Sequence, residues 1–138
     1  MRVLAIDYGA SRIGLAVSDP LGIIASPVGT IKSLGMKGDV DALAQKAKEL
    51  GADKIILGLP INMDGSEGVR AEISRKLAAV LQKVSGISVE LVDERLSTVS
   101  AERALDEANV RRDKRKQVVD TISAQIILGT YLEKQKHL

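Results

Sequence analysis

Apolar and polar positions in the first quarter of the chain follow the pattern of β-strands. Residues 2–7 are an apolar run that ends at an acid and a glycine-containing turn, which predicts a first strand. Residues 13–18 alternate between larger and smaller side chains and predict a second strand. A third extended stretch covers residues 23–31, where Pro27 favours an edge position because proline cannot donate a backbone hydrogen bond. The short connections between the three predict an antiparallel meander.

From residue 40 onward the apolar positions follow a helical period in several segments. This spacing predicts four helices, within residues 40–50, 73–84, 99–108 and 118–132. A continuous apolar run at residues 54–58 is typical of a strand buried on both faces of a parallel sheet, and a fifth strand follows at residues 89–92. Residues 60–68 are predicted to form a loop.

A meander followed by a β-α-β unit favours one arrangement of the sheet. Right-handed crossovers into parallel strands give a five-stranded mixed sheet with the first strand central, strand order 3-2-1-4-5 and helices on its faces. That is the arrangement of the RNase H-like α/β fold. The chain has 138 residues, of which 45% are hydrophobic and 28% charged, so we expect a single domain over residues 1–138.

The composition narrows the classes of function. There is no Trp and no Phe, and the only aromatic residues are Tyr8 and Tyr131, which argues against recognition by rows of base-stacking aromatics. There is no Cys, which excludes disulfides, thiol catalysis and the common zinc frameworks. The apolar start is too short for a signal peptide, and no apolar run approaches the roughly 20 residues that cross a membrane. We therefore expect a cytoplasmic protein with no membrane partner.

One strongly basic segment contrasts with a net charge of only +2. Residues 111–116 hold five basic residues and one acid, a local charge of +4. Such a segment is typical either of a solvated loop or of an anion-binding patch, and the charge alone favours neither.

Four acids fall where a metal site can form. Asp7 ends the first predicted strand, and the adjacent Asp93 and Glu94 end the fifth. In open α/β sheets, sites form outside the carboxyl ends of the strands. Asp120 lies in the last predicted helix among apolar residues, where a carboxylate is costly to bury unless it is paired or liganded. Such acids can hold hard divalent cations, and two Mg²⁺ ions roughly 3.5–4 Å apart can promote hydrolysis of a phosphodiester.

Each acid also has a purely structural interpretation. Asp7 could form a turn or a cap, and Asp120 could pair locally. Asp93 and Glu94 could form a surface ion pair with the Arg95 that follows them. Adjacent residues point to opposite faces of a strand, so the phasing does not decide whether Asp93 or Glu94 faces a metal. Only the joint placement of the acids favours a metal site.

The glycine-containing turn within residues 7–14 has two interpretations as well. Its small side chains would let backbone N–H groups approach a phosphate, as in the hairpins of the actin, Hsp70 and sugar-kinase superfamily. Alternatively, the glycines serve only a tight β-hairpin. Those ATPases close two domains over ATP, whereas this chain has room for one, so we expect no kinase activity from a single chain.

Four motifs span nearly the whole chain. They are Asp7-Tyr8-Gly9 with Arg12-Ile13-Gly14, Gly58-Leu59-Pro60 with Asn62-Met63-Asp64-Gly65, Asp93-Glu94-Arg95-Leu96-Ser97-Thr98, and Lys116 with Asp120, Ser123 and Ala124. In this order they resemble the YqgF (RuvX) family of Holliday-junction resolvases, also described as pre-16S ribosomal RNA nucleases. Ala10 departs from the family pattern, which has Thr in many members, but it replaces no expected metal ligand.

The resemblance implies an RNase H-like nuclease that depends on Mg²⁺ or Mn²⁺. By position, Asp7, Glu94 and Asp120 correspond to the catalytic, metal-binding acids, so the family pattern favours Glu94 over Asp93. Asp64 would share the rim of the site or form an Asx turn. Nucleic-acid contacts are expected from Arg12, Asn62, Arg95, Arg111, Arg112, Lys114, Arg115 and Lys116. Of these, residues 111–116 are expected to form a flexible loop that grips phosphates.

Three functions from different classes follow, and the third is a binder of nucleotide phosphates at the hairpin of residues 7–14. The first is a metal-dependent endonuclease on structured nucleic acid that processes the 5′ end of pre-16S rRNA in ribosome biogenesis, resolves branched DNA, or does both. The second is a non-catalytic nucleic-acid-binding factor in transcription or ribosome assembly. A symmetric four-way junction calls for a homodimer, whereas RNA trimming does not, so the sequence is compatible with a monomer or a homodimer.

Overall fold

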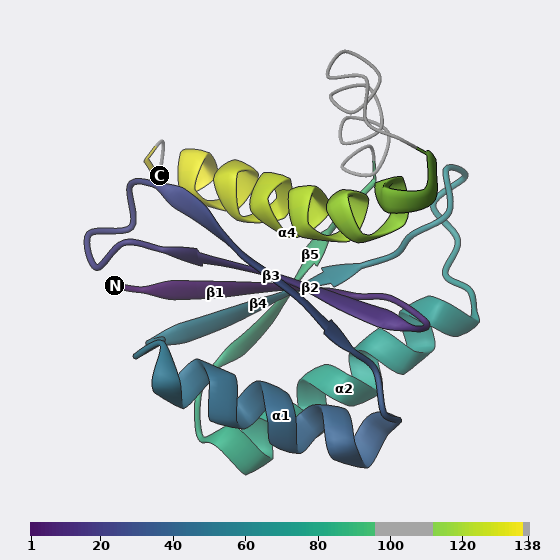
Figure 1. Ribbon diagram of the computed structural model, residues 1–138, viewed down its shortest axis with the longest axis horizontal. Coiled ribbons are helices and arrows are strands. Elements are labelled where there is room, and N and C mark those ends of the chain that lie inside the picture. The colour runs from purple at the N-terminus through teal and green to yellow at the C-terminus, as the bar shows by residue number, and fades with distance from the viewer. Residues whose placement is uncertain (96–111, 137–138) are drawn as a thin grey trace.

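The computed structural model describes residues 1–95 and 112–136, which form a five-stranded sheet between two layers of helices (Figure 1). The strands are β1 (Val3–Tyr8), β2 (Arg12–Ser18), β3 (Ala25–Lys32), β4 (Lys54–Leu59) and β5 (Val89–Asp93). The helices are α1 (Met36–Glu49), α2 (Val69–Ser85) and α4 (Arg112–Lys136).

The strand order β3-β2-β1-β4-β5 confirms the predicted topology. β1 is central, antiparallel to β2 and parallel to β4, and β5 continues the parallel half. β3 pairs antiparallel with β2 at the edge of the sheet and contains Pro27, as its sequence predicted. The carboxyl ends of β1, β4 and β5 therefore lie along one edge of the sheet.

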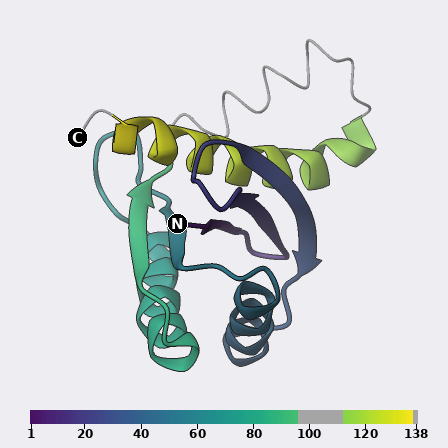
Figure 2. The ribbon, with the colours of Figure 1, turned by 90° about the vertical axis from the view of Figure 1, so that its left-hand side faces the viewer.

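Two hydrophobic cores lie on opposite faces of the sheet. Leu4 and Ile6 of β1 are fully buried on the face covered by α1 and α2. Val3 and Ala5 are buried on the other face, which α4 alone covers among the described helices (Figure 2). Successive residues of β1 thus serve different cores, and Asp7 shares the α4 face with Val3 and Ala5.

The ends of α2 and α4 show what the apolar pattern detects. α2 ends at Ser85, one residue after the predicted segment, and Gly86 follows with a φ of 72°, the left-handed conformation that closes many helices. α4 begins at Arg112, so the prediction of a loop over residues 111–116 is wrong for residues 112–116. Lys and Arg are good helix formers, but a run of charges has no apolar period from which a helix can be recognised.

Two of the predicted features lie outside the described residues, namely Arg111 and the helix expected at 99–108. Among the described residues, no helix is both long and apolar enough to cross a membrane.

A candidate metal site at the carboxyl edge of the sheet

Asp7 and Glu94 meet at the carboxyl edge, on the face covered by α4. In β5, Val92 packs into the core beneath α4, and Glu94 follows two residues later. The side chain of Glu94 shares a hydrogen bond with that of Asp7. Of the two adjacent acids, Glu94 is therefore the one that joins Asp7, which is the choice that the family pattern favoured.

Glycines on both neighbouring strands make room around Asp7. Gly14 of β2 lies directly opposite Asp7 in the antiparallel register. On the other side, Ile6 pairs with Leu57, which places Gly58 of β4 beside Asp7. A methyl group on Gly58 would collide with Oε2 of Glu94, so the carboxyl group of Glu94 occupies the space that this glycine leaves free.

Burial is the main influence on Glu94. Removal from water raises the pKa of its carboxyl group above the ordinary value of 4.5, since the charged form loses hydration. The hydrogen bond with Asp7 lowers the pKa, the charge of Asp93 raises it and the charge of Arg70 lowers it. A desolvated carboxyl group held against a second acid is a favourable place for a divalent cation, whose charge would stabilise both carboxylates.

Asp93 takes the structural role that the sequence left open. Its carboxylate accepts hydrogen bonds from the backbone N–H of Arg95 at 2.9 Å and from Nε at 2.8 Å, and Nη2 lies 2.7 Å away. These hydrogen bonds with Arg95 hold the pKa of Asp93 below its ordinary value. The predicted surface ion pair thus forms between Asp93 and Arg95 and leaves Glu94 to Asp7.

The third expected ligand, Asp120, belongs to α4 and lies two helical turns before Ile127. Ile127 Cδ1 would lie 3.0 Å from a Cβ on Gly58, so this part of α4 packs over β4. The amino-terminal half of α4 lies on the same side of the molecule as the carboxyl end of β1 (Figure 1). The side chain of Asp120 is outside the described set, and within that set no three His, Cys, Asp or Glu residues form a metal-binding group.

Arg70 is part of this site and was missed in the sequence analysis. Its Nη2 donates a 2.8 Å hydrogen bond to the backbone carbonyl of Tyr8, and its guanidinium lies 5.7 Å from the centre of the Tyr8 ring. Its charge also lowers the pKa of Glu94. Arg70 precedes the periodic apolar residues of α2, so no local pattern distinguishes it from other surface arginines.

In the loop between β4 and α2, Asn62 and Asp64 form hydrogen bonds within the loop itself. Asp64 Oδ1 accepts hydrogen bonds from the backbone N–H of Ser66 at 2.9 Å and from its Oγ at 2.6 Å, which is the Asx-turn arrangement. Asn62 Nδ2 donates to Ser66 Oγ at 2.9 Å. Both side chains brace the loop, and the Ser66 bonds lower the pKa of Asp64.

The structure describes only some of the other residues that were predicted to contact nucleic acid. Arg12 begins β2 immediately after a tight turn, in which a Cβ on Gly9 would lie 2.5 Å from the carbonyl oxygen of Arg12. Four basic residues of the 111–116 segment lie in the first turns of α4, with side chains outside the described set: Arg112, Lys114, Arg115 and Lys116.

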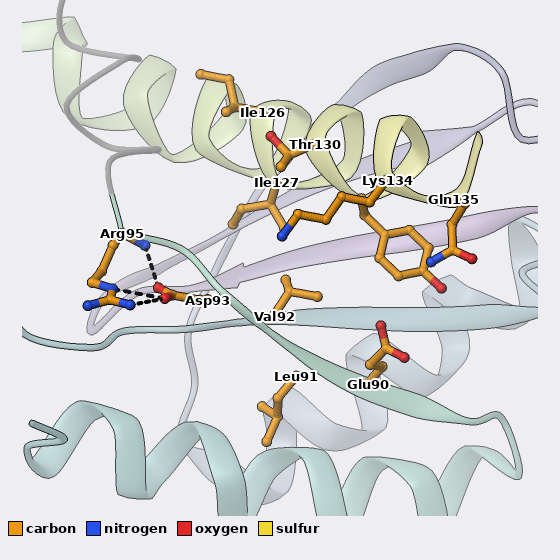
Figure 3. Close-up of a pocket in the computed structure, with 11 residues that line it drawn as sticks. Glu90, Leu91, Val92, Asp93, Arg95, Ile126, Ile127, Thr130, Lys134 and Gln135 are labelled. Carbon is orange, nitrogen blue, oxygen red and sulfur yellow. Dashed lines mark hydrogen bonds and ion pairs between the residues drawn. The ribbon is translucent and has the colours of Figure 1, made fainter. Parts of the chain in front are cut away.

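A hollow of about 390 Å³ adjoins the site between β5 and α4. Figure 3 shows the paired Asp93 and Arg95 at one end of it, with Lys134 of α4 extending over the strand. Val92 and Ile127 contribute apolar surface to its lining. The positive charge of Lys134 contributes to the lowered pKa of Asp93.

Comparison with known proteins identifies relatives over almost the full length of the chain. The model of a family described as "RuvX: Holliday junction resolvase" matches residues 1–134. A Myxococcus xanthus protein named "Putative pre-16S rRNA nuclease" is 50% identical over 133 residues, which cover 96% of this chain and 88% of that protein. A Clostridioides difficile protein of the same name is 47% identical over 132 residues, covering 96% and 94%.

Solved structures confirm the RNase H-like fold at low sequence identity. RuvC from Thermus thermophilus, solved with a Holliday junction substrate, superposes with a TM-score of 0.63 at 12% identity, covering 99% of this chain and 96% of that one. The fowlpox virus Holliday junction resolvase gives a TM-score of 0.58 at 16% identity, covering 98% and 99%.

Proposed function

Because the chain belongs to the RuvX family, we propose that it is a metal-dependent endonuclease acting on structured nucleic acid. The observation that carries this proposal is the meeting of Asp7 and Glu94 at the carboxyl edge of the sheet. The names of its relatives favour precursor 16S rRNA as the substrate, and the family description adds branched DNA. We infer a single catalytic domain over residues 1–138, and a monomer suffices for RNA processing.

The donor set fits a hard divalent cation. Asp7 and Glu94 offer carboxylate oxygens, and Asp120 on α4 is the third donor that we assign. Mg²⁺ or Mn²⁺ bound there would activate water and stabilise the charge that develops on a phosphodiester. Gly58 leaves the Glu94 carboxyl group room beside Asp7, and Arg70 fixes the carbonyl of Tyr8, the residue after Asp7. These contacts hold the two acids in place.

Basic residues around this edge are assigned to the phosphates. Arg95 is held by Asp93 but its side chain is 38% exposed, so it can also meet a phosphate oxygen. Arg12, Asn62 and residues 111–116 complete the contact set that we propose. Contacts of this kind position a nucleic acid without reading its sequence, and they make binding depend steeply on salt.

Cleavage assays test the proposal directly. Purified protein is given precursor 16S rRNA and four-way DNA junctions with Mg²⁺, Mn²⁺ or EDTA. We expect metal-dependent cleavage that is lost in Asp7→Asn and Asp120→Asn. Asp41→Asn, which changes an exposed acid of α1, is the matched control and should cleave normally. Cleavage that survives both site variants would overturn the assignment of the acids, and binding without cleavage would establish the non-catalytic factor instead.

Salt dependence tests the basic segment separately. Neutralising the five basic residues of 111–116 together should flatten the fall of the binding constant with salt. The logarithmic slope should change by roughly 0.9 for each phosphate that these residues no longer neutralise. An unchanged slope would remove them from the interface.

A further inference from the structure

The loop that follows β4 is attached to the candidate site at both ends. At its start, the backbone carbonyl of Leu59 accepts a hydrogen bond from the N–H of Glu94 at 3.3 Å. At its end, Arg70 donates to the carbonyl of Tyr8 at 2.8 Å. The loop, residues 60–68, is therefore held at the edge where we place the scissile phosphate.

The loop is braced by its own hydrogen bonds. Backbone bonds of 2.8 Å run from Asn62 N–H to the Ser66 carbonyl and from Gly65 N–H to the Asn62 carbonyl. Gly65 adopts a φ of 89°, which favours glycine, and the Asp64–Ser66 bonds close the turn. Such internal bonding restricts the motion of the loop before any ligand is present.

The ion pair between Glu67 and Arg75 adds an attachment to α2. Nε and Nη2 of Arg75 lie 2.7 and 2.8 Å from the two carboxylate oxygens of Glu67. The loop is thus connected to the candidate site and to the body of α2.

Met63 lies at the tip of this braced loop with 72% of its surface exposed. Its neighbours Asn62 and Asp64 are both occupied within the loop. Met63 is thus a strongly exposed apolar side chain at the tip of a loop whose two ends are attached to the candidate site. Met63 fills no part of either core, so its side chain is available to a molecule that approaches this loop.

The tyrosines do not provide a stacking surface at this edge. Tyr8 is 8% exposed and donates its hydroxyl to Asp39, on the face opposite Asp7. Tyr131 is also 8% exposed, and its hydroxyl accepts a hydrogen bond from Lys54. Since the sequence has no Phe and no Trp, any apolar contact with bases must come from an aliphatic or thioether side chain.

From these observations we propose that Met63 inserts between neighbouring bases of the nucleic-acid substrate beside the scissile phosphate. The inference rests on the proposed nuclease function and adds a contact with the bases to it. Methionine is among the apolar side chains that proteins insert between base steps, where it partly unstacks them and bends the helix. The rigid loop supplies a fixed point of entry, and the polarizable thioether adapts to any base. The contribution of Met63 is therefore greatest on fully paired substrates, whose bases do not separate without help.

A fluorescence assay tests insertion without requiring cleavage. Four-way junctions and RNA helices carry 2-aminopurine at successive positions, and the protein carries Asp7→Asn so that the substrate stays intact. Unstacking raises the fluorescence of this base. We expect a rise at one or two adjacent positions with Met63 present and its loss in Met63→Ala. Leu34→Ala removes another exposed apolar residue, 75% exposed after β3, and should keep the rise.

Cleavage kinetics with otherwise unmodified protein supply the second measurement. Met63→Ala should lower kcat/KM on fully paired substrate on the order of tenfold. Met63→Leu should restore most of that loss. Substrates with a mismatch at the fluorescent position should reduce the loss to less than about twofold, because their bases are already unstacked. A purely structural role of Met63 would lower the rate equally on paired and mismatched substrates.

The outcomes separate the two proposals. Equal fluorescence in the presence and absence of the Met63 side chain overturns the insertion, whatever the protein cleaves. A fluorescence rise that depends on Met63, with no cleavage in any metal, keeps the insertion and overturns the nuclease. Absence of binding to every substrate overturns both.

Discussion

Asp39 and Glu94 are acids on opposite faces of the same sheet, and their surroundings differ: Asp39 is buried among neutral donors, whereas Glu94 is half-buried against a second acid. Asp39 is 1% exposed and accepts hydrogen bonds from the Tyr8 hydroxyl at 2.5 Å, the Ser33 hydroxyl at 2.5 Å and the Leu34 N–H at 2.8 Å. Glu94 instead lies against another acid, and burial raises its pKa. An acid with matched donors stabilises a fold, whereas an acid held against a second acid is a candidate metal ligand.

One peptide unit connects the two environments. Asp7 and Tyr8 are consecutive in β1, so their side chains point to opposite faces. The Tyr8 hydroxyl binds Asp39 while Asp7 meets Glu94, and Arg70 holds the carbonyl of Tyr8. The hydrogen bonds of Tyr8 on the face covered by α1 and α2 thereby help to fix the position of Asp7 on the face covered by α4.

The largest effect on stability should come from removing Asp39, the acid that neutral donors surround. Asp39→Ala leaves two hydroxyls and a backbone N–H without their acceptor, which should lower the free energy of unfolding by about 3 kcal/mol. Urea unfolding followed by circular dichroism measures this loss. A loss below about 1 kcal/mol would show that the three donors find other acceptors and that the contrast with Glu94 is smaller than we describe.

Gly58→Ala should act on the other acid. The added methyl group collides with Oε2 of Glu94 and must displace it from Asp7. We expect cleavage to fall about a hundredfold, the upper range for disturbing residues that orient metal ligands. Gly86→Ala, at the end of α2, is a control for the loss of a glycine away from the site. Comparable losses of cleavage in both variants would attribute the effect to folding.

Arg70→Ala should have a smaller effect on activity, about tenfold. The variant removes the hydrogen bond to Tyr8 and the charge that lowers the pKa of Glu94. When cleavage rates are measured over a range of metal concentrations, the variant should need more metal to reach half of its maximal rate. The rate at saturating metal should change little. Lys76→Ala, which removes an exposed cation of the same helix, provides the comparison. An unchanged metal titration in Arg70→Ala would remove Arg70 from the site.

The smallest effect is a gain in stability from Glu94→Gln in metal-free protein. Because folding raises the pKa of Glu94, its protonated form stabilises the fold at acidic pH, and this contribution is lost as pH rises from about 4.5 through the raised value. Glutamine remains uncharged, so the variant should melt higher than the native chain at pH 7 and similarly at pH 4. Mg²⁺ should raise the melting temperature of the native chain alone. If Glu94→Gln melts at a lower temperature than the native chain at pH 7, the prediction that the charge of Glu94 destabilises the metal-free fold is wrong.

The sheet was predictable because its order follows from short connections and the alternation of β1, whereas the contacts of Asp39 and Arg70 were not. Both contacts depend on where helices return to the sheet: Asp39 in the first turn of α1 and Arg70 in the first turn of α2. Such positions come from tertiary packing, which local periodicity does not contain. Glu94 was separated from Asp93 only by the family pattern until the structure showed which acid joins Asp7.

Gly14 and Gly58, on either side of Asp7, have one more consequence. Neighbouring strands are separated by roughly 4.8 Å, so the backbone of three hydrogen-bonded strands limits the space around Asp7, and the carboxyl group of Glu94 fills part of it. Every other amino acid at either glycine adds at least a methyl group to this space. Substitution of either glycine can therefore only narrow this space, and the smallest possible step is one methyl group.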